Sequence, residues 1–185
     1  MNKTSLIYPI IIFFLIFLLS LNEVSLAQDR PQIPNFSIRN LSGELFESGK
    51  HLGQPLVLSF FFIPCPPCYK EMPALYEFMR QEGRLKQLLF VDSYVKALEI
   101  NEVPDTERQI RKFVNSLNIP LESVYFDQIG TLLKKMTQSG AFPQAKRIGT
   151  LVIYPSIVVI NGNGKLVLTL EGTGPGFLEK IQKAL

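Results

Sequence analysis

The sequence predicts an α/β fold, in which a central sheet is flanked by helices. The stretch 56–62 is apolar at nearly every position, as in a strand that is buried on both faces of its sheet. The apolar residues of the stretch 110–117 recur with the three- and four-residue spacing of an amphipathic helix. The residues 161–164 form a turn typical of a hairpin between two apolar runs. The resulting order is strand, helix, strand, helix, strand, hairpin, helix.

Composition indicates one compact domain. The chain has 185 residues, of which 46% are apolar, and this is enough for a single core of ordinary size. The net charge is only +3, which argues against a nucleic-acid partner. We expect a monomer.

The first 27 residues have the pattern of a signal peptide. Lys3 supplies a basic start, the stretch 6–19 is almost entirely apolar, and small residues precede an expected cleavage before Gln28. The apolar run is shorter than the roughly 20 residues of a spanning helix, although an uncleaved N-terminal anchor remains the alternative. We therefore expect residues 28–185 to be one domain in the periplasm or another extracytoplasmic compartment, where cysteine pairs are usually oxidised.

The first part of this domain contains two short strands. The stretch 33–38 is expected to be a strand with Phe36 and Ile38 on one face, and the turn 40–44 leads to a second strand that begins at 45–46. His51 is the only histidine, and we expect it in a solvated loop, because no other residue with ligand chemistry lies near it in sequence.

Helices and strands alternate through the rest of the chain. A helix is expected from about Pro66, with Pro73 bending it and Gly83 ending it. Asp105 or Thr106 is expected to cap the next helix. The other expected elements are strands at 88–91, 124–127, 156–160 and 165–170, and helices at 131–137 and 177–185.

Cys65 and Cys68 are the only cysteines, and they lie between the apolar strand and the helix that follows it. The start of a helix favours an anion, so a thiol there ionises easily, and the thiolate is the form that attacks disulfides. The pair could instead be half of a zinc site or an inert structural disulfide. Zinc needs four ligands, which the chain does not offer, and a bridge over so short a loop restricts the unfolded chain little. The spacing therefore favours redox chemistry.

The segment 64–73, Pro-Cys-Pro-Pro-Cys-Tyr-Lys-Glu-Met-Pro, follows an aromatic-rich strand and resembles the active-site segment of the TlpA/ResA-like thioredoxins. These are bacterial extracytoplasmic thiol-disulfide oxidoreductases. The similarity extends from about Ile33 to the C-terminus. It implies a thioredoxin fold with a central mixed sheet and an added N-terminal hairpin. It also implies a disulfide-containing protein substrate, with apocytochrome c thiols as one candidate, and a membrane thiol donor. Neither a cofactor nor a metal is expected.

The resemblance assigns roles to the two cysteines. Cys65 would be the nucleophile and the more exposed thiol, and Cys68, one step into the helix, would resolve the mixed disulfide. Pro66 and Pro67 have no N–H, which leaves the N–H of Cys68 as the nearest one able to reach the Cys65 sulfur. We expect a thiolate less stabilised than in a loop with fewer prolines.

Pro155 resembles the cis-proline that packs against the disulfide in this family. A cis bond would hold the Tyr154 backbone extended beside Cys65, where a substrate strand could pair with it. The alternative is an ordinary trans-proline at the first residue of a strand. The substrate is also expected to contact Pro64, Pro66 and Pro67.

Glu71 lies three residues after Cys68, on the same helix face, where ResA-like members have a glutamate. A carboxylate there would raise the pKa of a thiol and could carry its proton. The alternative is a solvated surface glutamate. Cytoplasmic-type thioredoxins have a proton-carrying aspartate six residues before the first cysteine, but here that residue is Ser59.

Three features depart from the family. Pro64 replaces the usual tryptophan, and Tyr69 replaces the usual basic residue after the second cysteine. The segment 138–149 is longer than usual and contains Phe142 and the pair Lys146-Arg147, so it is either a solvated loop or a rim that contacts a partner.

The predicted function is an exported reductase of disulfides in partner proteins. A thiol peroxidase would have a threonine at the position of Phe62. A copper carrier would have three residues between its cysteines and a distal histidine, whereas here only two residues separate them and His51 lies upstream. A redox-inert protein with a permanent disulfide is the remaining alternative.

Overall fold

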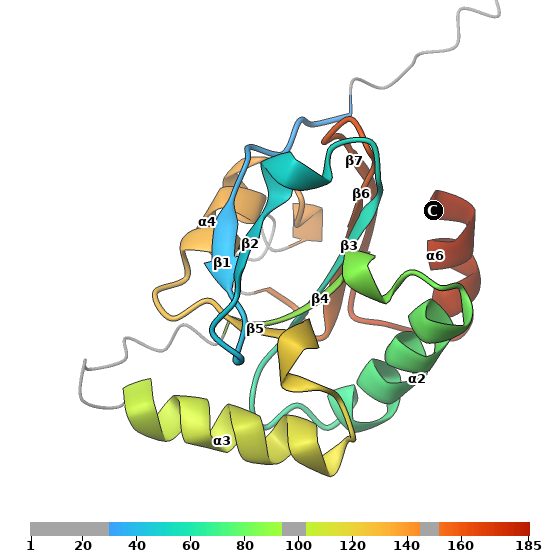
Figure 1. Cartoon of the computed structure of the whole chain (residues 1–185). Helices are drawn as coiled ribbons and strands as arrows, with labels where there is room; N and C mark the ends of the chain where they lie inside the picture. The colour runs from blue at the N-terminus through green and yellow to red at the C-terminus, as the bar shows by residue number, and fades with distance from the viewer. Residues whose placement is uncertain (1–29, 94–102, 145–151) are drawn as a thin grey trace, which may run out of the picture.

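The computed structural model describes residues 30–93, 103–144 and 152–185. Its main sheet has the strand order β5-β4-β3-β6-β7 (Figure 1). β3 runs parallel to β4 and β4 parallel to β5, whereas β6 is antiparallel to both β3 and β7. The sheet is therefore mixed, as predicted. The strands are β3 (Leu56–Phe61), β4 (Leu88–Asp92), β5 (Val124–Phe126), β6 (Ser156–Ile160) and β7 (Leu166–Glu171).

β3 is the central strand of the sheet. All six of its residues are buried, because β4 and β6 flank it and both faces of the sheet are covered. Ser59 lies opposite Phe90 of β4 and Ile157 of β6. The apolar run in the sequence therefore predicts the place of this strand correctly.

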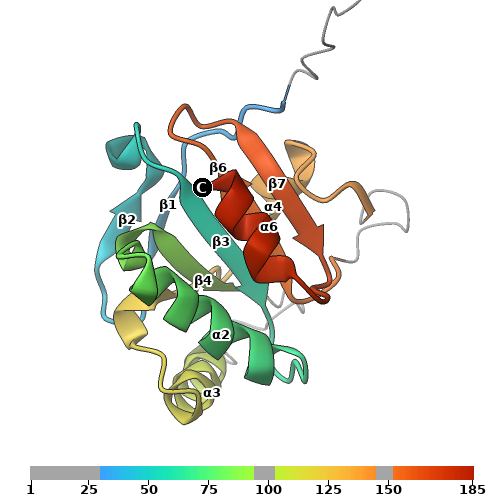
Figure 2. The same ribbon diagram turned by 90° about the vertical axis from the view of Figure 1, so that its right-hand side faces the viewer.

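The helices cover the two faces of the sheet unequally. Figure 2 shows α2 and α6 in front of the sheet, whereas Figure 1 shows α4 and the N-terminal hairpin on the opposite side. Each face has its own apolar cluster, one with α2, α3 and α6 and the other with α4 and the hairpin. The helices are α2 (Cys68–Gln81), α3 (Val103–Ser116), α4 (Thr131–Gln138) and α6 (Phe177–Ala184), with short 3-10 helices η2 (Ser48–His51), η3 (Leu85–Gln87) and η5 (Leu121–Ser123).

The N-terminal hairpin consists of β1 (Ser37–Arg39) and β2 (Leu45–Glu47), which pair antiparallel. Asn40 fixes its turn, because the Asn40 Oδ1 atom accepts hydrogen bonds from the N–H groups of Ser42 (3.1 Å) and Glu44 (2.8 Å). Phe36 and Ile38 are both buried, as their expected common face requires. The first strand begins at Ser37, four residues later than predicted.

Two predicted helix starts are wrong. α2 begins at Cys68 rather than Pro66. The N–H groups of Tyr69 and Lys70 donate to the oxygens three residues earlier (3.4 and 3.1 Å), and the first bond with α-helical spacing runs from the N–H of Glu71 to the oxygen of Pro67 (3.1 Å). α3 begins at Val103, so the predicted caps lie inside its first turn, where Asp105 forms an exposed ion pair with Arg108 (2.6 Å). The end of α2 is confirmed, since Gly83 follows it with a φ of +68°.

His51 is not the solvated loop residue that the sequence predicts. It ends η2, is half-buried, and stacks on the ring of Phe46 with 4.4 Å between the ring centroids. Because η2 directly follows β2, it turns His51 back onto Phe46, which lies only five residues earlier in the chain.

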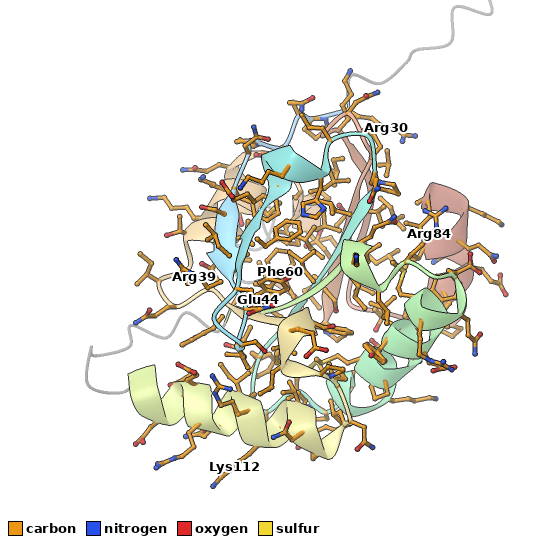
Figure 3. All side chains as sticks on the ribbon, in the orientation of Figure 1. Arg30, Arg39, Glu44, Phe60, Arg84 and Lys112 are labelled. Atoms are coloured by element: carbon orange, nitrogen blue, oxygen red, sulfur yellow. A yellow bond between two sulfur atoms is a disulfide. The ribbon has the colours of Figure 1, made fainter. Side chains whose placement is uncertain are left out.

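The first part of the 138–149 segment contains core residues, which corrects the interpretation of that part as a solvated loop. Ala141 is fully buried, and Phe142 is 1% exposed. The Phe142 ring packs edge-on against Phe60 with 5.4 Å between ring centroids, and Figure 3 shows Phe60 in the interior of the molecule. Thr169 of β7 donates to the carbonyl oxygen of Ala141 (2.8 Å), which fastens the segment to the sheet. Lys146 and Arg147 lie outside the described residues.

Residues 1–27, predicted to be a signal peptide or an anchor, also lie outside the described part of the chain. Within the described ranges, no helix has the length and apolar character needed to cross a membrane.

Candidate active site

The two cysteines form a disulfide beyond the carboxyl end of β3. Cys65 and Cys68 are bonded, with 5.3 Å between their Cα atoms, and Cys68 is the first residue of α2. The strand, the turn of prolines and the helix thus place the pair where the sequence predicts it.

The predicted difference in exposure between the cysteines is wrong. Both are fully buried, in the apolar cluster that also contains Phe61, Phe113 and Ile157. The turn between strand and helix directs its sulfur atoms inward, whereas its three prolines are exposed. These prolines, Pro64, Pro66 and Pro67, form a rigid apolar rim beside the disulfide.

The N–H of Cys68 does not point to a free sulfur in this oxidised state. It donates to the carbonyl oxygen of Cys65 (3.0 Å), and the N–H of Lys70 donates to that of Pro67 (3.1 Å). A Cys65 thiolate would gain the Cys68 N–H only if this bond were given up. The weakly stabilised thiolate concerns the reduced protein and stays a prediction.

The peptide bond between Tyr154 and Pro155 is cis, which confirms that prediction. Pro155 is buried and directly precedes β6, whose first residue, Ser156, lies opposite Phe60 near the carboxyl end of β3. The N–H of Gly172 donates to the carbonyl oxygen of Pro155 (3.1 Å). The bond between Ile63 and Pro64 is also cis, which sequence reasoning missed because nothing distinguishes this X-Pro pair from the others.

Glu71 is not a freely solvated surface glutamate. It lies in the first turn of α2 and is half-buried, and its Oε2 atom is buried without a hydrogen-bond partner among the described residues. Burial raises the pKa of this carboxyl, and the positive charge of Lys70 opposes the shift. Ser59, in β3, is buried as well.

Sequence reasoning missed the contacts of the Tyr154 side chain. Its hydroxyl lies 3.1 Å from the hydroxyl of Ser93 and donates to the Ser93 carbonyl oxygen at 3.2 Å. Its ring packs against Phe62, with 5.1 Å between ring centroids. These contacts join the ends of two strands to the loop that contains the cis-proline.

Two buried aspartates lie at the same edge of the sheet. Asp92 ends β4 and Asp127 directly follows β5, and the N–H of Asp127 donates to the carbonyl oxygen of Asp92 (2.9 Å). The Asp127 carboxylate accepts from the N–H groups of Leu132 (3.1 Å) and Leu133 (2.8 Å), and so caps α4. Burial raises the pKa of Asp127, although these bonds oppose the shift. Each aspartate follows an apolar run, and that signal could have placed both at one edge.

The described residues contain no group of three or more His, Cys, Asp or Glu side chains arranged to hold a metal ion. The chemistry that the site offers is that of a dithiol and its disulfide, with one half-buried carboxyl nearby.

Comparison with known proteins places the chain in a family. The sequence model described as the AhpC/TSA family matches residues 30–169, which is most of the chain. The thioredoxin-like protein YneN of Bacillus subtilis is 29% identical over 93 residues, which are 50% of this chain and 50% of that protein. The chain thus spans about half the length of the curated relative that it matches.

Solved structures show the same fold. A thiol:disulfide interchange protein of the thioredoxin family from Chlorobium tepidum matches with a TM-score of 0.62 at 17% identity, over 84% of this chain and 96% of that one. The exposed lipoprotein thioredoxin of Streptococcus pneumoniae matches with a TM-score of 0.59 at 20% identity, over 82% and 98%. A secreted disulfide oxidoreductase of Mycobacterium tuberculosis matches with a TM-score of 0.55 at 18% identity, over 80% and 92%. The chain therefore belongs to the AhpC/TSA family and has the thioredoxin fold.

Proposed function

We propose that this protein is an exported reductase of disulfides in partner proteins and that it acts through the Cys65–Cys68 dithiol. The observation that carries the proposal is the position of this disulfide, between the carboxyl end of β3 and the start of α2 and near the loop of the cis-proline Pro155. Among the similar structures are a secreted disulfide oxidoreductase and an exposed lipoprotein, which supports a location outside the cytoplasm.

The reaction begins with the reduced protein. The Cys65 thiolate attacks one sulfur of the partner disulfide, whose S–S bond breaks, and the released partner thiolate takes up a proton. The Cys68 thiol then loses its proton and attacks the Cys65 sulfur, which releases the second partner thiol. Two electrons have moved to the partner, and the Cys65–Cys68 disulfide has formed. A membrane dithiol donor would return the protein to its reduced state.

Glu71 is proposed to handle the proton of Cys68. It follows Cys68 by one helical turn, and its buried Oε2 atom has no hydrogen-bond partner in the described part of the chain. Because burial raises the pKa of this carboxyl, it accepts a proton more readily than a solvated glutamate does. As an anion it disfavours a second negative charge on a nearby thiol.

The substrate is proposed to bind across the rim. The backbone of Tyr154 before Pro155 would pair with an extended segment of the partner, and the exposed prolines Pro64, Pro66 and Pro67 would contact its apolar side chains. Backbone pairing tolerates many sequences, so disulfide-containing proteins form the substrate class, with apocytochrome c thiols as one candidate. We also propose that residues 1–27 direct export or anchor the protein, and that it acts as a monomer.

The test is mechanism-based trapping with the full-length protein. In Cys68→Ser, Cys65 can attack a disulfide but no second thiol can release it, so this variant should accumulate mixed disulfides with native, oxidised insulin. The variant Cys65→Ser should form none. The wild-type protein should increase the rate at which dithiothreitol reduces insulin. Failure of the wild type to reduce insulin, together with rapid consumption of hydrogen peroxide, would replace the proposal by a thiol peroxidase.

A further inference from the structure

The side chain of Tyr154 is held by contacts inside the protein. Its hydroxyl meets both the side chain and the carbonyl oxygen of Ser93, at 3.1 and 3.2 Å, and its ring lies against Phe62. Burial raises the pKa of the Tyr154 hydroxyl; the hydrogen bond with Ser93 opposes this shift, and the carboxyls of Asp92 and Asp127 add to it, so the hydroxyl remains a protonated donor.

The groups that hold Tyr154 are themselves fixed. The N–H of Ser93 donates to the carbonyl oxygen of Phe61 at 3.1 Å, which ties the residue after β4 to the end of β3. Ser93 is fully buried. Phe62 directly follows β3 and lies three positions before Cys65. The Tyr154 side chain therefore connects the cis-proline loop to the two strand ends nearest the disulfide.

We infer that Tyr154 is a positioning residue, whose side chain fastens the backbone before Pro155 in the place where it pairs with a substrate strand. This inference rests on the proposed function. Since its hydroxyl is bound inside the protein, Tyr154 pairs with the substrate through its main chain and not through its side chain. The neighbouring exposed side chains face the side chains of the partner. An unfastened loop would have to be ordered at each binding event, which weakens binding but leaves the chemistry of the cysteines unchanged.

The variant Tyr154→Phe tests this inference, because it keeps the ring against Phe62 and removes only the hydroxyl. Two probes are compared with the full-length protein: insulin, whose chain can pair as a strand, and the small disulfide 5,5′-dithiobis(2-nitrobenzoate), which cannot. A hydrogen bond of ordinary strength corresponds to about a five-fold change in an equilibrium constant. We expect KM for insulin to rise about five-fold, with kcat, the rate with the small disulfide and the reduction potential unchanged.

Two further variants sharpen the test. Ser93→Ala leaves the carbonyl acceptor in place, so it should raise KM for insulin less than Tyr154→Phe does. The double variant Ser93→Ala/Tyr154→Phe should have the same KM as Tyr154→Phe alone. Tyr76→Phe, on α2 among the partly buried residues of the core, is the matched control and should leave KM unchanged. Equal loss with both probes, or a shifted potential, would overturn the inference, because Tyr154 would then act on the cysteines themselves.

Hydrogen exchange separates this inference from the proposed function. In peptides that cover Tyr154 and Pro155, exchange should be faster in Tyr154→Phe than in the wild type, whether or not either protein reduces insulin. If the wild type reduces neither probe while exchange increases as expected, the proposed function fails and the fastening stands. Unchanged exchange would contradict the fastening itself.

Discussion

Glu71 lies one helical turn after Cys68 in α2, and its Oε2 atom is buried with no hydrogen-bond partner among the described residues. A buried carboxyl oxygen without a donor is costly as an anion, so the pKa of Glu71 lies above that of a solvated glutamate. The carboxyl is therefore suited to take a proton from the resolving thiol. This relationship leads to two predictions, one about the thiols and one about stability.

Glu71→Gln should make the thiols of the reduced protein more acidic, because the like charge beside them is removed. It should also slow release of the mixed disulfide, because the proton acceptor is lost. The rate of alkylation by iodoacetamide, followed against pH, measures the first effect, and stopped-flow reduction of insulin measures the second. Glu77→Gln is the control, since Glu77 lies on the same helix in an exposed ion pair with Arg80 (2.7 Å). Identical pH profiles for wild type and Glu71→Gln would remove Glu71 from the mechanism.

The raised pKa of Glu71 also predicts how stability depends on pH. Its folded pKa lies above the unfolded value of 4.5, so the folded state binds more of this proton and stability falls as pH rises from about that value through the folded pKa. Glu71→Gln lacks this loss, so it should be more stable than the wild type at pH 7 and should show no such gain at pH 3. Urea unfolding of both oxidised proteins at the two pH values checks this, and a gain of equal size at both would disprove the linkage.

Phe142→Ala should cost about 3–5 kcal/mol of unfolding free energy, because the ring is fully enclosed against Phe60 and its loss leaves a cavity. Ile129→Ala is the matched control: its side chain is 79% exposed, and its change should stay within about 0.5 kcal/mol. Urea unfolding of the oxidised proteins gives both values. A cost for Phe142→Ala no larger than that of the control would mean that the segment after α4 is not part of the core.

Asp127→Ala should destabilise the protein by about 1 kcal/mol, because α4 loses the carboxylate that accepts from its first N–H groups. Asp127→Asn keeps one acceptor oxygen and should lose less. Gln128→Ala, in the same loop but exposed, should be close to neutral. The three values come from denaturant unfolding, and an undiminished loss in Asp127→Asn would show that charge, rather than capping, is what matters there.

Patterns local in the sequence predicted the fold well. The apolar run of β3, the amphipathic spacing of α3 and the turn before β7 each act within about ten residues, so their elements are close to where the sequence places them. The cis bond before Pro155 came from the resemblance of its surroundings to a known family.

Contacts between distant segments could not be predicted in this way. Phe142 lies among polar and small residues in the sequence, and it becomes core through an apolar cluster that includes Phe60, which is far away in the chain. The bond between Tyr154 and Ser93 joins residues that are 61 positions apart. Cys65 is likewise buried in an apolar cluster whose members include Phe113 and Ile157, which lie far away in the chain.

The reduction potential of the Cys65–Cys68 pair in the full-length protein tests the central claim most directly. Thiols that are buried, lie near Glu71 and have few N–H donors are weakly acidic, and a less stable thiolate favours the disulfide and lowers the potential. Equilibration in dithiothreitol buffers followed by thiol trapping should give a value near that of thioredoxin, about −270 mV. A value near −120 mV would make the protein an oxidase, and a disulfide that does not exchange at all would make it a structural one.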